Sequence, residues 1–320
     1  MAYRAAIAGC GLIGSGFSDT MTLPGVWSHA DAYTRCPETD LVAVCDQNGE
    51  KSERCAKRWN GAAHHTDFSA MLDDAKPEII SICTPDALHY PQIKTALEHP
   101  AVRAVLAEKP LSLAREEAQE LIALAAQRGV VLAVNYTRRY AAGFWHLKKM
   151  LDAGKLGKVQ AISGFYTKGT LHNGAHWFDL ARWLLGPIAE ASGVDVLHEA
   201  GNDPTLDAAL TFASGARGYL HGLSAADYAL FEMDIACSGG RARIVDSGFR
   251  IEIQHLEDSP FGAGYRRLSE TESLSGELPE ALYNAVDNLA RCLKDGATPR
   301  CTGEDALAAL DIALAVRASA

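Results

Sequence analysis

Three glycines near the start of the chain constrain its fold more than any other feature. They stand in the run Gly9-Cys10-Gly11-Leu12-Ile13-Gly14, which follows the apolar segment of residues 4–8 and precedes a segment that can begin a helix. A strand that leads through G-x-G-x-x-G into a helix is typical of a dinucleotide-binding βαβ unit. We expect the backbone of this turn, Leu12 and Ile13 included, to hold a diphosphate. The spacing alone is weak evidence, because glycine-rich turns are common, so the context must support it.

An acidic residue follows the next apolar segment. Residues 41–45 predict a second strand, and Asp46 and Gln47 come directly after it. A carboxylate at this position accepts hydrogen bonds from the adenosine ribose, which favours NAD over a cofactor with a 2′-phosphate. The alternative is that Asp46 only caps the next helix.

The distance between these two motifs is longer than usual. Asp46 lies 32 positions after Gly14, where about 20 is typical. Residues 15–28 contain Gly16, Pro24 and Gly25 and show no helical periodicity. We interpret them as a loop that interrupts the first helix, which resumes near residues 29–33.

A predicted strand followed directly by polar residues occurs again further along the chain. Residues 79–83 form an uninterrupted apolar run, as expected for a strand buried on both faces of a parallel sheet, and Thr84-Pro85-Asp86 follows it. Ligands of open parallel sheets collect outside the carboxyl ends of the strands. Thr84, Pro85 and the nearby His89 are therefore predicted to line the nicotinamide side of a cleft.

A lysine stands at the end of another predicted strand. Residues 102–107 lead into Glu108-Lys109-Pro110. Oxidation of a secondary alcohol by hydride transfer needs a base for the hydroxyl proton, and a lysine can serve when burial or neighbouring cations lower its pKa. Pro110 biases Lys109 away from helical dihedral angles, so the backbone defines its position. We expect Lys109 to be catalytic and Glu108 to be its charge partner or a cofactor contact; the alternative is an ordinary surface lysine.

With a later run, Gly174-Ala175-His176-Trp177-Phe178-Asp179, these motifs resemble the glucose-fructose oxidoreductase, inositol dehydrogenase and rhizopine-catabolism family of oxidoreductases. The resemblance covers nearly the whole chain and rests on the order and spacing of the motifs. It implies an α/β Rossmann domain over residues 1–137 and an α+β domain with a large, mostly antiparallel sheet over residues 138–320. It also implies hydride transfer between NAD(P) and a sugar, polyol or related compound by a homodimer or homotetramer that packs through that sheet.

The resembled family usually carries an aspartate four residues before the histidine, and this pair works with the lysine on the reacting hydroxyl. His172 holds the aspartate position in this chain. An imidazole can accept a proton or hydrogen-bond a sugar hydroxyl, but it brings no fixed negative charge. We therefore expect Lys109 and His176 to keep their roles and His172 to be a substrate or relay residue. At spacing i, i+4, i+7, His172, His176 and Asp179 would share one helix face.

Four further side chains have two possible roles each. Asp179 would orient His176 or bind substrate. Trp177 would stack on a sugar or nicotinamide ring, or pack in the core. Arg138 would bind substrate or cofactor, or belong to a seam between the domains, and Lys168 would face the cleft or the solvent. A metal site is disfavoured, because no Cys or Glu ligand stands at zinc spacing nearby.

The rest of the chain limits the function classes. Beyond residue 187 the pattern changes to strands joined by turns, and residues 279–294 and 304–318 predict two final helices. The net charge of −10 gives no basic surface for nucleic acid or an anionic membrane. No apolar run suits a membrane span, and the first residues lead directly into a strand, so we expect a cytoplasmic protein. The eight cysteines show no C-x-x-C pair and are expected to be reduced thiols.

Two alternatives of another class remain open. One is a sensor that binds nicotinamide or sugar and catalyses nothing, which the histidine at position 172 makes conceivable. The other is a glycosidase that retains NAD and uses transient oxidation to eliminate a substituent.

Overall fold

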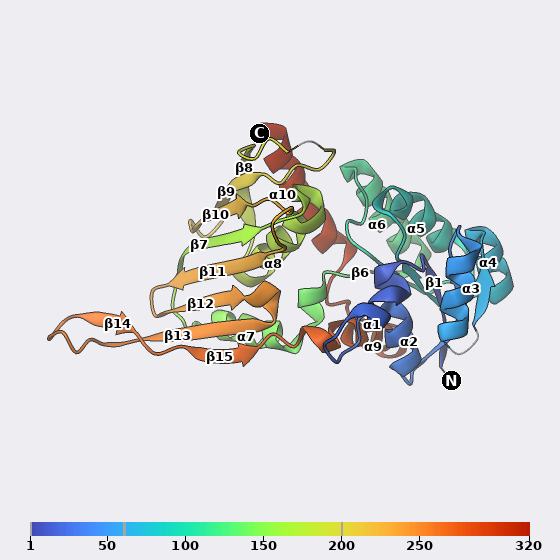
Figure 1. Cartoon of the computed structure of the whole chain (residues 1–320), viewed down its shortest axis with the longest axis horizontal. Helices are drawn as coiled ribbons and strands as arrows, with labels where there is room; N and C mark the ends of the chain where they lie inside the picture. Colours follow the sequence, from blue (N-terminus) through green and yellow to red (C-terminus); the bar gives the residue numbers. More distant parts are fainter. Residues whose placement is uncertain (1, 60–61, 200) are drawn as a thin grey trace. The chain divides into compact units, whose positions relative to one another are not determined.

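The computed structural model describes residues 2–59, 62–199 and 201–320 (Figure 1). The chain forms two compact units. The first contains the residues up to Tyr140 together with Pro279–Leu307, and the second contains Ala141–Leu278 and Ala308–Ala320. The break after Tyr140 lies close to the predicted boundary, but residues 279–307 return to the first unit, which the sequence did not indicate.

The first unit is built on a six-stranded parallel sheet with strand order β3-β2-β1-β4-β5-β6. This is the strand order of the doubly wound dinucleotide-binding fold, so the predicted Rossmann domain is confirmed. β4 and β5 are buried at every position, because helices cover both faces of the sheet. The strands are Tyr3–Ala8 (β1), Thr39–Cys45 (β2), Ala63–His65 (β3), Ile79–Ile82 (β4), Ala104–Ala107 (β5) and Val131–Val134 (β6).

Local sequence explains where the helices of this unit begin. The side chains of Ser28, Asn48 and Asp67 each accept a hydrogen bond from a backbone N–H in the first turn of the helix that follows. Gly129, in the left-handed conformation, ends α6. The helices are Phe17–Thr20 (α1), His29–Arg35 (α2), Gly49–Arg58 (α3), Phe68–Ala75 (α4), His89–Glu98 (α5), Arg115–Arg128 (α6) and Ala281–Asp295 (α9).

The predicted interruption of the first helix is present but shorter than expected. A π-helical turn, Leu12–Gly16, and α1 keep the chain helical to Thr20, and the helix resumes at His29. The prediction that the loop begins at residue 15 is therefore wrong. The irregular part is fixed by packing, because Val26 donates its N–H to the Pro279 carbonyl at 2.8 Å, and a Cβ on Gly25 would lie 2.6 Å from the Pro279 side chain.

The second unit contains a nine-stranded sheet in which β15 pairs with β13 and the other strands follow the order β14-β13-β12-β11-β7-β10-β9-β8. β7 and β10 are parallel and the other neighbouring pairs are antiparallel, which confirms the predicted large, mostly antiparallel sheet. The strands are Val159–Tyr166 (β7), Ile188–Val194 (β8), Asp207–Phe212 (β9), Arg217–Gly222 (β10), Phe231–Cys237 (β11), Gly240–Val245 (β12), Arg250–Asp258 (β13), Arg266–Leu268 (β14) and Glu272–Ser275 (β15).

Helices Ala142–Asp152 (α7) and Ala175–Leu185 (α8) lie on one face of this sheet (Figure 1). The last helix, Gly303–Ser319 (α10), crosses the unit boundary, and its C-terminal part packs on β8, where Ser319 accepts the Gly193 N–H at 2.8 Å. In the described part of the chain, no helix is both long and apolar enough to cross a lipid bilayer.

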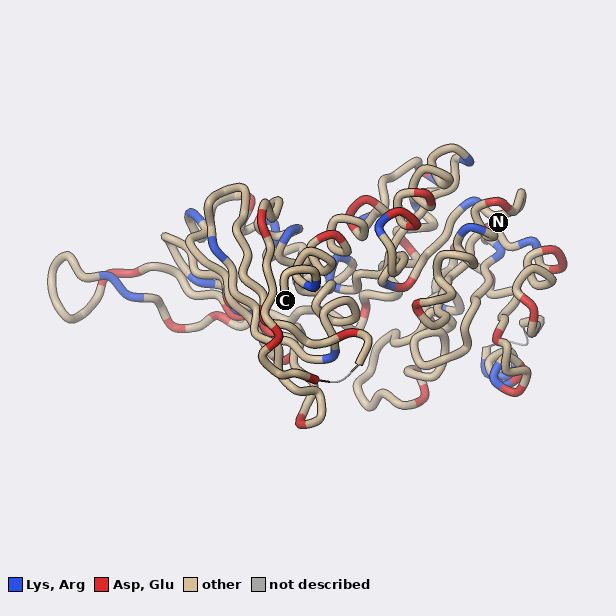
Figure 2. Tube along the Cα trace, turned by 90° about the horizontal axis from the view of Figure 1, so that it is seen from above, with Lys and Arg blue, Asp and Glu red and all other residues tan. Residues whose placement is uncertain are grey.

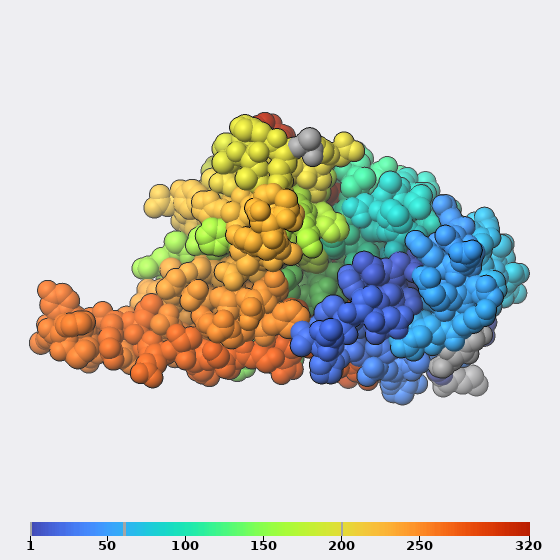
Figure 3. All heavy atoms as spheres, viewed as in Figure 1, coloured from blue at the N-terminus to red at the C-terminus, as the bar shows by residue number. Residues whose placement is uncertain are grey.

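A hairpin of β13 and β14 projects from the sheet of the second unit, as Figure 3 shows in orange. Its strands carry opposite charges side by side (Figure 2), with Arg267 2.8 Å from Glu257 and Arg266 3.7 Å from Asp258. Phe261 at its tip is 89% exposed.

Candidate active site

The three glycines of the first turn differ in what surrounds them. Gly9 has φ 95°, and a Cβ there would lie 2.4 Å from the Cys83 carbonyl oxygen; a Cβ on Gly14 would lie 2.0 Å from the Gly9 carbonyl oxygen. A Cβ on Gly11 would meet nothing within 4 Å. The first and third glycines are therefore required by the protein itself, whereas the second leaves open space that a diphosphate can fill.

This turn borders a cavity of about 440 Å³ at the carboxyl ends of β1, β2 and β4. Its walls include six residues that the sequence predicts to hold the cofactor: Gly9, Gly11, Asp46, Gln47, Thr84 and Pro85. They also include residues that the sequence interpretation missed, among them Lys51, Thr66, Asp67, Phe68, Leu88 and Gln92. The end of β3 was the available signal for three of these, but β3 is too short and too polar to be recognised as a strand.

The Asp46 carboxylate is held by two backbone N–H groups. Its Oδ2 accepts from Cys10 and its Oδ1 from Asn48, both at 2.9 Å. The N-cap of α3 is Asn48, so the alternative role of Asp46 as a cap does not apply. A carboxylate has about four lone-pair sites, which leaves acceptor capacity for the ribose hydroxyls of a dinucleotide. The glycine turn, the cavity and this carboxylate fit NAD.

Glu108 and Lys109 follow β5 and are each only 9% exposed. Burial alone would raise the pKa of Glu108. Hydrogen bonds from His29 and Asn135 and the positive charge of Lys109 outweigh burial, and the pKa of Glu108 lies below its usual range. Lys109 therefore stands beside a buried, ionised carboxylate rather than on an open surface.

His89 is completely buried. Its Nδ1 lies 2.6 Å from the Pro110 carbonyl oxygen and its Nε2 lies 2.8 Å from the Thr84 carbonyl oxygen. His89 was predicted to line the cleft, but its ring is buried and both ring nitrogens are hydrogen-bonded to backbone carbonyl groups. The ring links the turn after β4, which borders the cavity, to the turn that carries Lys109.

In the second unit, His176 lies in the first turn of α8 and the buried Asp179 lies one turn later. His172 is exposed and belongs to a preceding π-helical turn, Gly169–Gly174, so the expected α-helical spacing does not extend to it. Asp203 anchors this turn by accepting the N–H groups of Leu171 and His172, both at 2.9 Å. Asp203 stands 31 residues beyond His172, and no sequence signal pointed to it.

The structure separates the alternatives for several other predicted residues. Trp177 is completely buried against β7 and β11, and its Nε1 donates to the Glu232 carbonyl at 3.0 Å. It is a core residue, so the prediction that it stacks on a ligand ring is wrong.

Lys168 is exposed, with φ 70°, two residues after the end of β7. Burial lowers the pKa of Arg138 to about 9, so its guanidinium stays charged at neutral pH. Among the described residues, no group of three or more His, Cys, Asp or Glu could hold a metal ion.

Two family models match the chain. The model described as the oxidoreductase family with an NAD-binding Rossmann fold matches residues 5–136, and the GFO/IDH/MocA C-terminal domain matches residues 168–243. A D-glucoside 3-dehydrogenase of Escherichia coli is 30% identical over 49% of this chain and 50% of its own length, so the match spans about half of that relative. An inositol 2-dehydrogenase of Rhizobium meliloti is 26% identical over 89% of this chain and 90% of its own length.

Solved structures share the fold at lower identity. A levoglucosan dehydrogenase in complex with NADH and levoglucosan has a TM-score of 0.84 at 16% identity, covering 100% of this chain and 97% of that one. A dehydrogenase of Bordetella pertussis in complex with NADH and UDP-GlcNAcA has a TM-score of 0.80 at 22% identity, with 100% and 96% covered.

Proposed function

The chain belongs to the GFO/IDH/MocA oxidoreductase family with an NAD-binding Rossmann fold, and from this premise we propose that it transfers a hydride between NAD and a hydroxyl-bearing carbon of a sugar, polyol or sugar derivative. The observation that carries the proposal is the buried Glu108-Lys109 turn, which His89 links to Thr84 in the cavity wall. Alcohol oxidation requires an acid–base group, and the turn that carries Lys109 is connected through His89 to the wall of the dinucleotide cavity.

The chain's own residues perform binding and proton transfer in this proposal. Gly11 and Asp46 hold the diphosphate and the ribose, and NAD supplies the hydride acceptor when it is bound. Lys109 takes the proton of the reacting hydroxyl at Nζ, or returns it in the opposite direction. From the second unit, we assign His176 to hydrogen-bond the substrate hydroxyl, His172 to relay or substrate contact, and Asp179 to the orientation of His176. Arg138 and Lys168 remain candidate substrate contacts.

The substrate class is supported by the names of the relatives. The relatives are named inositol 2-dehydrogenase and D-glucoside 3-dehydrogenase, and inositols and glucosides are ring compounds that carry hydroxyl groups. A few hydrogen bonds to the substrate hydroxyl groups decide which compound of this class fits.

Absorbance of reduced nicotinamide tests the proposal. The purified protein is incubated with NAD, and in parallel with NADP, and with a panel of sugars, inositols, glycosides and sugar acids. We expect one compound class to reduce NAD, with NADP the poorer cofactor because Asp46 would repel a 2′-phosphate. Binding of NAD without reduction by any compound would favour a sensor, and release of an aglycone without net NADH would favour an NAD-retaining glycosidase.

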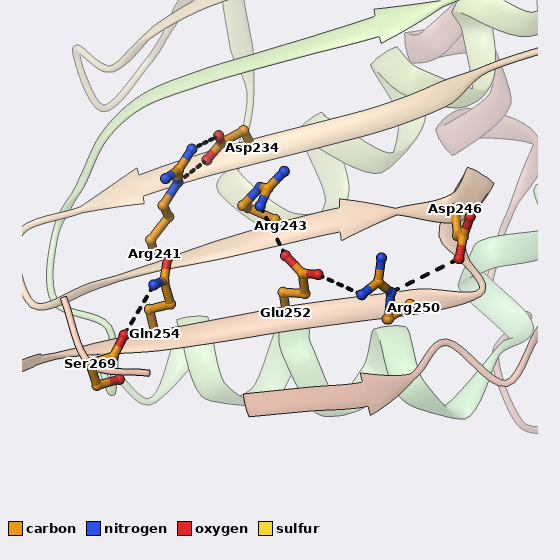
Figure 4. Close-up of polar contacts among 8 residues, drawn as sticks. All are labelled: Asp234, Arg241, Arg243, Asp246, Arg250, Glu252, Gln254 and Ser269. Carbon is orange, nitrogen blue, oxygen red and sulfur yellow. Dashed lines mark hydrogen bonds and ion pairs between the residues drawn. The ribbon is translucent and has the colours of Figure 1, made fainter. Parts of the chain in front are cut away.

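We also propose that the protein is a homodimer or homotetramer that packs through the second unit's sheet. Phe165 and Tyr219 point outward from the neighbouring strands β7 and β10, are 43% and 51% exposed, and have the His221 ring beside Phe165 at 5.5 Å. Beside this aromatic group, β11–β13 carry an ordered set of ion pairs (Figure 4), formed by Asp234 with Arg241 and by Glu252 with Arg243 and Arg250. An apolar centre beside a polar rim is typical of a protein interface.

The double variant Phe165→Glu and Tyr219→Glu is expected to be monomeric, because two carboxylates would be buried without partners at the centre of the interface. Light scattering after size exclusion measures the mass. The matched control is Phe261→Glu on the projecting hairpin, which should keep the wild-type mass. A wild-type protein that runs as a monomer would exclude the proposal.

We propose that the protein is cytoplasmic. All eight cysteines are free thiols and seven of them are buried, which fits a reducing compartment.

A further inference from the structure

Five buried side chains of the first unit form one continuous hydrogen-bonded chain. Tyr33 Oη lies 2.7 Å from Ser81 Oγ, Ser81 Oγ lies 2.8 Å from His29 Nδ1, and His29 Nε2 lies 2.8 Å from Glu108 Oε1. Asn135 completes the chain, because its Nδ2 donates to the same Glu108 oxygen at 2.7 Å. His29, Tyr33 and Ser81 are completely buried. These hydrogen bonds connect α2 and β4 to Glu108 after β5 and to Asn135 after β6. Glu108 is the residue before Lys109.

The partners fix the direction of the donors. In the described part of the first unit, the Tyr33 hydroxyl has no partner except Ser81, and the Ser81 hydroxyl has none except Tyr33 and His29. If Tyr33 donates to Ser81 and Ser81 donates to His29 Nδ1, every proton in the chain has an acceptor. If His29 Nδ1 carried a proton, one of the two hydroxyl protons would be buried without an acceptor, which is costly in a dry interior.

The hydrogen bond between His29 and Glu108 leads to the same protonation of the His29 ring. An ionised carboxylate only accepts hydrogen bonds, so His29 Nε2 must be the protonated nitrogen. The Asn135 amide donates to Glu108 Oε1, and Lys109 is the next residue in the chain; both favour the ionised carboxylate. From Tyr33 through Ser81 and His29, each donor therefore points towards Glu108, an arrangement in which successive hydrogen bonds strengthen one another.

We propose that His29 is a positioning residue: as a neutral imidazole protonated on Nε2, it holds Glu108 as a buried carboxylate and thereby fixes the turn that carries Lys109. The inference rests on the proposed function where it treats Lys109 as the acid–base group. It also addresses the histidine at position 172, because Glu108 supplies a fixed negative charge next to Lys109 that His172 does not provide.

The first test is the protonation state of the His29 ring, read from the nitrogen resonances of histidine-labelled protein at neutral pH. The signals are assigned by their loss in His29→Gln. We expect a protonated Nε2 and an unprotonated Nδ1. In Ser81→Ala the Nδ1 signal should shift, because it loses its donor, while Nε2 stays protonated. A proton on Nδ1 in the wild type overturns the inference, and this readout requires no turnover.

The second test separates positioning from simple packing. His29→Leu keeps an apolar side chain in the site but removes the donor to Glu108, and a small displacement of Lys109 is expected to lower kcat roughly a hundredfold with an unchanged Kd for NAD. His29→Gln, whose amide can still donate to Glu108, should recover most of the turnover. Equal kcat in the Leu variant and the wild type would overturn the positioning role.

A measurement that needs no substrate also tests the positioning role of His29. Reductive methylation of the folded protein, followed by peptide mass spectrometry, reports the reactivity of the Lys109 amine. The reactivity should change in His29→Leu and be restored in His29→Gln. If the resonances and the amine reactivity behave as expected but no compound reduces NAD, the proposed function is wrong, whereas the inferred role of His29 in holding Glu108 is supported.

Discussion

Replacing Lys109 by methionine is expected to lower kcat roughly a hundredfold or more, as is typical for the loss of a general acid–base group, while the Kd for NAD changes little. The Lys109 side chain is almost completely enclosed, and methionine keeps its unbranched apolar stem while removing the amine. The turn is held from both sides without the amine, because His29 bonds to Glu108 and His89 bonds to the Pro110 carbonyl. The loss should therefore concern proton transfer rather than the fold.

A second lysine of the same unit provides the matched control. Lys51 borders the cofactor cavity from the first turn of α3, the helix that follows β2 and Asp46. Lys51→Met is expected to change the Kd for NAD and leave kcat at saturating cofactor unchanged. Calorimetry with NAD and steady-state kinetics on the identified substrate separate the two phenotypes. Unchanged turnover in Lys109→Met would remove Lys109 from the mechanism, and a large loss of NAD affinity would instead make it a cofactor contact.

One rule of parallel sheets made much of the cofactor site predictable. Asp46, Thr84 and Lys109 each follow a buried apolar run, and the carboxyl ends of parallel strands meet at one edge of the sheet. Asp46 and Thr84 do border the same cavity, and His89 ties the Lys109 turn to Thr84. The rule did not reach Phe68, because β3 is three residues long and contains two histidines instead of an apolar run.

Other features depend on tertiary pairing that leaves no local trace. His29 and Glu108 are 79 residues apart, and neither position has a periodicity that indicates its partner. Trp177 shows the complementary problem. An aromatic residue on an amphipathic helix fits a ring-binding wall and a core equally well, and only the close approach of Gly164 to its indole places it in the core. The fold class was thus predictable from the sequence pattern, whereas the hydrogen bonds that hold the Glu108-Lys109 turn were not.

The glycines of the first turn should differ in how alanine affects the Tm, because their surroundings differ. Gly14→Ala places a Cβ 2.0 Å from the Gly9 carbonyl oxygen, so the π-helical turn must move away from β1. Overpacking of this kind typically costs roughly 1–3 kcal/mol, so we expect a lower Tm together with weaker NAD binding. Thermal unfolding without NAD measures the first effect directly.

Gly11→Ala is expected to leave the Tm unchanged and to weaken NAD binding by roughly tenfold to a hundredfold, if the methyl group intrudes on the diphosphate by an ordinary overpacking energy. Gly11 has an extended backbone that alanine adopts without strain, and its Cβ would meet nothing in the protein itself. Gly16→Ala is the control in the same turn, because its Cβ would make only ordinary contacts, the nearest at 3.4 Å from Leu12, and both Tm and Kd should stay at wild-type values. Wild-type NAD affinity in Gly11→Ala would mean that the diphosphate does not approach this backbone. Since the empty space beside Gly11 is the feature that distinguishes a ligand-binding turn from one that merely packs well, that result would remove the main geometric argument for dinucleotide binding at this turn.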